Sequence, residues 1–104
     1  MDEIELLYFD GCPSWQTALE NLHQAIAAEN LSHQVRLIEI TTPQQAQEER
    51  FLGSPSFRMN GRDLWSEKRS RYNMSCRVYQ TDQGMRGSPT VDMLRVQIRE
   101  LLSK

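Results

Sequence analysis

The sequence contains little cysteine. Two of its 104 residues are Cys, at positions 12 and 76, too few for the disulfide framework of a small secreted domain. We therefore expect reduced thiols and a cytoplasmic location. The two cysteines and the two histidines, His23 and His33, show no paired metal-ligand spacing. The sequence accordingly predicts no metal site and no other cofactor.

Long apolar runs and a strong charge of one sign are also missing. No stretch approaches the roughly 18 apolar residues of a membrane span, and the acidic start "MDEIELLYF" has too short an apolar run for a secretory signal. The net charge is −2, which argues against nucleic acid and anionic membrane as main partners. The length of the chain predicts a single domain over residues 1–104.

Hydrophobic patterning predicts seven elements in the order β-α-β-α-β-β-α. Strands are expected at residues 4–9, 33–40, 54–61 and 76–81, and helices after Cys12-Pro13, Thr42-Pro43 and Ser88-Pro89. The first and last helices carry apolar stripes at helical spacing, which include Ala18, Leu22 and Ile26 in the first. Asn30 is expected to end the first helix, and Asn60-Gly61 to form a hairpin turn. Residues 62–75 lack a clean period and form a loop longer than most compact domains use. This order predicts an α/β fold with a four-stranded mixed sheet flanked by helices.

The three predicted helices share an X-Pro start. Proline suits the first turn of a helix, and the residue before it takes the cap position. Thr42 and Ser88 are good caps, whereas cysteine is not among the preferred cap residues. The unpaired N–H groups and partial positive charge of a helix N-terminus favour a thiolate. The pattern therefore predicts that Cys12 is a reactive thiol and not only a cap.

Two Gly-Ser-Pro segments are expected to behave differently. The first, "GSPS" at residues 53–56, leads into a predicted strand, whereas "GSPT" at residues 87–90 leads into a predicted helix. A proline before a helix suits a trans first-turn position. For the first segment the sequence alone also predicts a trans bond, because only about 5–6% of X-Pro bonds are cis.

Several motifs together resemble the thioredoxin-like superfamily over nearly the full length of the chain. They are "LLYFDGCPSW", "FLGSPSF", "SCRVYQT" and "GSPT". The similarity is to small bacterial thioredoxin-like proteins, some of which are labelled alkylmercury lyase. The resemblance implies a thioredoxin-like fold in which Cys12 is the nucleophile and Pro55 is the cis-proline that faces it. It further implies that Pro13, Trp15 and Ser54 line a substrate groove with Pro55.

The sequence departs from the thioredoxin pattern at two positions. Trp15 stands where a thioredoxin has its resolving cysteine, so no local disulfide can form. Leu6 stands where thioredoxins place a buried acid. Both departures indicate that any redox chemistry differs from ordinary dithiol–disulfide turnover.

Cys76 is a candidate second thiol. If residues 54–61 and 76–81 form a simple hairpin, a strand of roughly 17–20 Å separates Cys76 from the end of the sheet where Cys12 lies. A disulfide needs Cα atoms within about 7 Å. We therefore expect Cys76 to be a small buried hydrophobe. Two alternatives remain, namely that loop 62–75 folds back over Cys12, or that the thiols pair between chains.

The first functional hypothesis is a thiol-redox protein that uses Cys12 alone. Its thiolate would form a mixed disulfide with a low-molecular-weight thiol such as glutathione, or with a protein disulfide partner. Whether this amounts to an enzyme, a thiol–disulfide oxidoreductase, stays open. Two other hypotheses are a protein that binds a soft metal or organomercurial through thiolates, and a non-catalytic interaction domain.

The predicted loop 62–75 carries a cluster of basic residues. Lys68, Arg69 and Arg71 are expected to be solvated, although they could recognise an anionic partner such as the carboxylates of glutathione. We expect a monomer or a weak homodimer.

Overall fold

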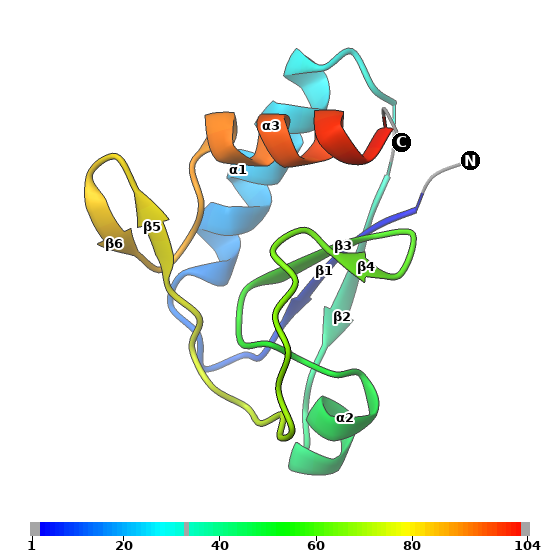
Figure 1. Cartoon of the computed structure of the whole chain (residues 1–104), viewed down its shortest axis with the longest axis vertical. Helices are drawn as coiled ribbons and strands as arrows, with labels where there is room; N and C mark the ends of the chain where they lie inside the picture. The colour runs from blue at the N-terminus through cyan, green and yellow to red at the C-terminus, as the bar shows by residue number, and fades with distance from the viewer. Residues whose placement is uncertain (1–2, 33, 103–104) are drawn as a thin grey trace.

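The computed structural model describes residues 3–32 and 34–102. The elements in chain order are β1 (Ile4–Tyr8), α1 (Trp15–Ala28), β2 (Val35–Glu39), α2 (Pro43–Glu48), β3 (Ser56–Met59), β4 (Arg62–Asp63), β5 (Tyr79–Thr81), β6 (Gly84–Arg86) and α3 (Val91–Leu102). Figure 1 shows their arrangement. The expected start of the second strand at residue 33 lies outside the described residues.

The central sheet has four strands in the order β2-β1-β3-β4. Strand β1 pairs in parallel with β2 and antiparallel with β3, and β3 pairs antiparallel with β4. Asn60 and Gly61 form the β3–β4 turn with φ values of 55° and 81°, the positive values that a two-residue hairpin turn requires. The prediction of an α/β fold with a four-stranded mixed sheet is confirmed.

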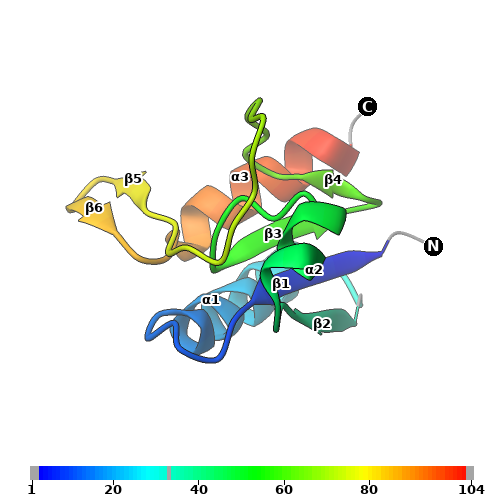
Figure 2. The same cartoon turned by 90° about the horizontal axis from the view of Figure 1, so that it is seen from below.

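The fourth strand is not the predicted one. The edge position belongs to β4, whereas residues 79–81 pair with β6 in a separate hairpin that projects from the body (Figures 1 and 2). After β4 the chain leaves the sheet, because Leu64 is buried in the core and Trp65 packs against it. Leu64 still donates a backbone hydrogen bond to Phe57, and the sheet ends there.

Apolar side chains bury both faces of the sheet. One face packs against α1 and α3, as the predicted stripes require, and its buried residues include Ile4, Leu6, Ala18, Leu22, Phe57, Leu94 and Ile98. The other face packs against α2 through Leu7, Ile40, Ala46 and Phe51. None of the described helices is both long and apolar enough to cross a membrane.

The shared X-Pro helix start holds for one helix of three. Thr42 caps α2 by accepting a hydrogen bond from the backbone N–H of Gln45 at 3.0 Å. Helix α1 begins at Trp15 with Ser14 as its cap residue, so the prediction that Cys12 is the cap is wrong. The reason is a turn before the helix, in which the Cys12 N–H donates to the carbonyl of Phe9.

The start of α3 differs in the same way. This helix begins at Val91, and the Thr90 hydroxyl accepts a hydrogen bond from the backbone N–H of Met93 at 3.2 Å. Ser88 and Pro89 lie before the helix and do not open it. Thr42 and Thr90 thus cap their helices through a side-chain oxygen, whereas Ser14 caps α1 without a side-chain hydrogen bond, and proline alone does not fix the cap position.

Candidate functional site at the Cys12 loop

Cys12 lies in the loop between β1 and α1 and is 5% exposed. Its Sγ donates a hydrogen bond to the carbonyl oxygen of Ser54, at a distance of 3.5 Å. The neighbours Gly11 and Pro13 are exposed. The thiol is thus covered by protein on one side, while the loop that carries it faces solvent.

Ser54 is almost completely buried and makes four polar contacts. Its hydroxyl accepts from the backbone N–H of Phe9 at 3.3 Å. Its own N–H donates to the carbonyl of Ser75 at 2.8 Å, and its carbonyl accepts from the N–H of Arg77 at 2.9 Å as well as from Cys12. Both backbone groups of Ser54 are therefore occupied by residues 75–77.

The structure places Cys76 beside Ser54, with which it forms an isolated parallel β-bridge. The expectation that Cys76 lies at the far end of the sheet is wrong, and so is the expectation that it is buried, because its side chain is exposed. The physical reason is the short β4 strand. Residues 64–75 return along the molecule to the end of the sheet that holds Ser54. This is the alternative in which the loop after β4 folds back toward Cys12.

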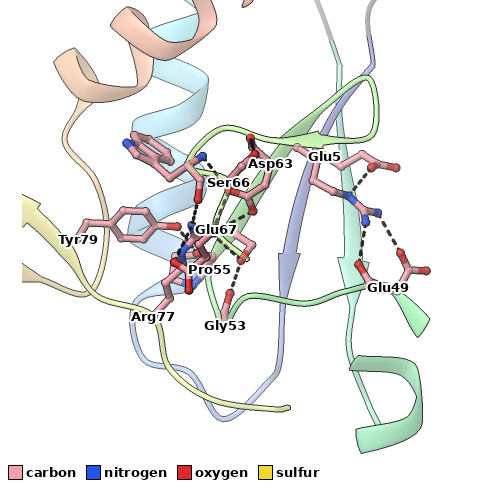
Figure 3. A network of polar contacts seen from close by, with 12 residues as sticks. Glu5, Glu49, Gly53, Pro55, Asp63, Ser66, Glu67, Arg77 and Tyr79 are labelled. Carbon is pink, nitrogen blue, oxygen red and sulfur yellow. Dashed lines mark hydrogen bonds and ion pairs between the residues drawn. The ribbon is translucent and has the colours of Figure 1, made fainter. Parts of the chain in front are cut away.

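Arg77 anchors this returning segment. Its side chain is buried and donates hydrogen bonds to both carboxylate oxygens of Asp63, at 3.2 and 3.0 Å, and to the hydroxyl of Ser56 at 3.1 Å. It also donates to the carbonyl of Trp65. Figure 3 shows Arg77 among these groups. The arginine thereby connects the returning segment, β3 and β4 through a single side chain.

Tyr79 adds a second anchor. Its hydroxyl donates to the carbonyl of Pro55 at 2.6 Å, and the Arg77 guanidinium carbon lies 5.2 Å from the centre of its ring (Figure 3). Burial raises the pKa of the Tyr79 hydroxyl, and the charge of Arg77 offsets this only in part. Burial also lowers the pKa of Arg77, but the charge of Tyr79 and the hydrogen bond and charge of Asp63 outweigh it, so the net shift is upward. Both groups therefore keep their protons across the physiological range.

The remaining predicted groove residues lie around this centre in different ways. Pro55 is buried, and the Ser54–Pro55 peptide bond is cis. Pro13 is exposed. Trp15 is partly buried and stacks on Tyr8, with ring centroids 4.1 Å apart and an interplanar angle of 21°. The structure thus brings Cys12 and Ser54 into contact, while the indole of Trp15 packs on β1.

The second Gly-Ser-Pro segment packs on the start of α1. A Cβ atom at Gly87 would lie 2.2 Å from the hydroxyl oxygen of Ser14, so glycine allows the close approach. The carbonyl of Pro89 accepts a hydrogen bond from the Asn21 side chain at 2.9 Å. The two Gly-Ser-Pro segments therefore contact the same Cys12–Ser14 stretch from different parts of the chain.

Sequence reasoning missed the buried charged residues. Arg77 carried no signal, because the apolar neighbours Cys76 and Val78 are the positions that a strand would bury, whereas in the structure both are exposed and Arg77 is buried. Glu5 is the other case. It is 6% exposed in β1 and forms ion pairs with Arg58 at 3.1 Å and Arg36 at 3.6 Å. A buried acid is thus present one residue before Leu6, on the face that packs against α2.

The charged loop does not converge on Cys12. Lys68, Arg69 and Arg71 are all exposed, and Arg69 pairs with Glu67. A hollow of about 420 Å³ borders this loop at Glu67 and Tyr72, and Cys12 is not among the residues that line it. Within residues 3–32 and 34–102, no three His, Cys, Asp or Glu side chains group closely enough to hold a metal ion.

No protein-family model matches this chain, and no curated protein or solved structure is significantly similar to it.

Proposed function

We propose that this chain is a thioredoxin-like thiol-redox protein in which Cys12 forms a mixed disulfide. The strand order supports the fold, because a parallel β1–β2 pair is extended by two antiparallel strands and helices pack on both faces. The single observation that carries the proposal is the placement of Cys12. Its Sγ lies 3.5 Å from the carbonyl of Ser54, the residue before Pro55.

The reaction begins with the Cys12 thiolate. It attacks one sulfur of a disulfide, forms the mixed disulfide and releases a thiolate that takes up a proton. The Sγ of Cys12 lies beside the Ser54 carbonyl, and Cys12 precedes the first residue of α1, Trp15, by three positions. The Sγ proton forms the hydrogen bond to the Ser54 carbonyl, so this hydrogen bond is lost when the thiol gives up its proton.

The surroundings of Ser54 favour a small substrate. An extended peptide binds a sheet by pairing with free backbone N–H and C=O groups. Those of Ser54 are already paired with Ser75 and Arg77. A protein disulfide could pair there only by displacing the returning segment. We therefore propose low-molecular-weight disulfides, such as glutathione disulfide, as the substrate class.

The test is modification of the thiols by glutathione disulfide, followed by intact mass and peptide mapping. The expected result is that the Cys76→Ser variant gains one glutathionyl group, mapped to Cys12. The Cys12→Ser,Cys76→Ser variant, which has the same fold but no thiol, is the control. Absence of a Cys12 adduct in Cys76→Ser would contradict the proposal.

A soft-metal site is the second candidate, because the structure brings Cys76 next to Ser54, which contacts Cys12. Two thiolates suit soft ions such as Hg(II) or Cu(I). Equilibrium dialysis with Hg(II), Cu(I) and Zn(II) separates the two functions. A metal-binding protein retains the soft ions far better than its cysteine-free variant does, whereas a redox-only protein does not.

A further inference from the structure

The backbone of Ser54 joins the two cysteine-bearing segments. Its carbonyl oxygen accepts from the Sγ of Cys12 at 3.5 Å and from the N–H of Arg77 at 2.9 Å. The Cys12 sulfur and the Arg77 nitrogen are therefore separated by less than the sum of these two distances. Cys76 immediately precedes that nitrogen and is the direct bridge partner of Ser54. Adjacent chains in such a pairing lie about 5 Å apart.

We infer that Cys76 is the resolving thiol for Cys12, so that the protein cycles between a dithiol and a Cys12–Cys76 disulfide. This rests on the proposed function, in which Cys12 forms the mixed disulfide. Trp15 stands where a thioredoxin has its resolving cysteine, and its indole stacks on Tyr8. The returning segment supplies a thiol at the same site from a part of the chain 64 positions later.

The two thiols differ in exposure. Cys12 is 5% exposed and Cys76 is exposed. A mixed disulfide on Cys12 lies beside the returning segment, where the Cys76 thiol is present at high effective concentration. An internal thiol therefore resolves the mixed disulfide faster than a thiol from solution does.

The segment that carries Cys76 is held at both ends. Ser75 and Arg77 pair with the backbone of Ser54, and the Arg77 side chain is fixed by Asp63. The pairing keeps Cys76 in register with Ser54. Arg77 thus acts as a positioning residue for the resolving thiol.

The electron balance is as follows for a low-molecular-weight disulfide RSSR. Attack by Cys12 gives the Cys12–SR mixed disulfide and one RS⁻. The Cys76 thiolate then attacks the Sγ of Cys12, the Cys12–Cys76 bond forms, and the second RS⁻ leaves. The two cysteines lose two electrons and two protons, and the substrate becomes two RSH. Two molecules of a low-molecular-weight thiol such as glutathione reverse the cycle.

The experiment is a time course of the reduced protein with glutathione disulfide, stopped with acid and read by intact mass. Wild type should pass rapidly to a form two hydrogens lighter with no glutathionyl group, mapped as a Cys12–Cys76 link within one chain. The Cys76→Ser variant should accumulate the Cys12 adduct, and that adduct should persist at least ten times longer than in wild type.

The matched control moves the thiol along the same segment. In Cys76→Ser,Val78→Cys the new thiol replaces a side chain that is 60% exposed and has no pairing with Ser54. We expect this variant to retain the adduct as long as Cys76→Ser does. If this variant loses the Cys12 adduct as fast as wild type does, the inference is overturned, because the position of the second thiol next to Ser54 would then be irrelevant.

Two further outcomes separate the inference from the proposed function. If wild type and Cys76→Ser accumulate the same Cys12 adduct at the same rate, Cys76 is not the resolving thiol and the proposed function stands. If glutathione attaches to Cys76 in Cys12→Ser but never to Cys12 in Cys76→Ser, both fail. Circular dichroism of each variant verifies that the fold is unchanged.

Discussion

The two Gly-Ser-Pro segments have three residues in common and play different structural roles. In residues 53–56, Ser54 is buried, its hydroxyl accepts from the Phe9 N–H, and its backbone joins the Cys12 loop to the returning segment. In residues 87–90, the contacts are a close approach to Ser14 and one hydrogen bond from Asn21. The first segment is held mainly by buried polar groups, and the second by the buried ring of Pro89 together with these two contacts.

This difference shows that a short motif acquires its role from what packs against it. The first segment follows α2 and enters the centre of the sheet, where every backbone polar group must find a partner. The second segment leaves a projecting hairpin and leads to α3, and its buried residue is Pro89, which has no backbone N–H that needs a partner. We expect substitutions around the first segment to cost more stability than equivalent ones around the second.

The largest effect is expected from Arg77→Met. The change removes the partner of a buried carboxylate, Asp63, and breaking a buried pair in this way costs on the order of 3–5 kcal/mol. Urea unfolding measures the loss in the free energy of unfolding. Arg86→Met in β6 is the control, because Arg86 is exposed, and its effect should stay within about 0.5 kcal/mol. Equal losses would show that the Arg77 network does not hold the returning segment.

A direct comparison of the two segments uses alanine at their first residues. Gly53 has φ 115°, and a Cβ there would lie 2.9 Å from the Cβ of Arg77, so Gly53→Ala is strained in both backbone and packing. We expect a loss on the order of 2–4 kcal/mol. Gly87→Ala should cost about 1–2 kcal/mol, because the added Cβ meets the hydroxyl and the Cβ of Ser14, at 2.2 and 2.9 Å, but no positive-φ strain adds to this contact.

The same unfolding measurement sharpens this comparison further. In the Ser14→Ala background the hydroxyl is gone, so the cost of Gly87→Ala should fall. The cost of Gly53→Ala should not change in that background. A greater loss at Gly87 than at Gly53 would reverse the order of the two segments.

The smallest effect concerns the ion pairs between the end of α1 and α3, the helix that follows the second segment. Hydrogen bonds from Arg99 and Arg95 lower the pKa of Glu29 from 4.5 to about 2, and these bonds connect α1 with α3. Because the folded pKa lies below the unfolded one, Glu29 contributes stability above about pH 4.5, and this contribution is lost as the pH falls toward 2. The stability difference between wild type and Glu29→Gln should therefore shrink over that range.

Salt provides a check on the Glu29 result. The arginines are partly exposed, so high ionic strength should reduce the difference at neutral pH. A difference that is independent of both pH and salt would show that Glu29 acts through packing and not through its charge.

Local features of the fold were predictable because neighbouring residues decide them. The helical spacing of Ala18, Leu22 and Ile26 fixed the buried side of α1. Asn30 adopts φ 58° after that helix, as the sequence indicated. Thr42 caps α2 because its partner Gln45 is three residues away. Each of these contacts spans at most one or two helical turns.

Long-range features were not predictable, because residues far apart in the sequence decide them. The hairpin turn at Asn60-Gly61 was correct, but nothing local states that β4 ends after Asp63 and that Leu64 then enters the core. That early exit reversed the expected position of Cys76. The cap position of Cys12 was also misjudged, because a turn from Phe9 lies before the helix.

The sequence by itself determined the elements from β1 to β3 and the final helix, the apolar stripes that bury the helices, and the presence of one cysteine in the turn between β1 and α1. Only the tertiary structure decided that the second cysteine lies at the same site. The reason is that Arg77 needs Asp63 and Ser56 to bury its charge, and Ser54 needs partners for its backbone groups. These requirements bring residues 75–77 to Ser54, and Cys76 is brought there with them.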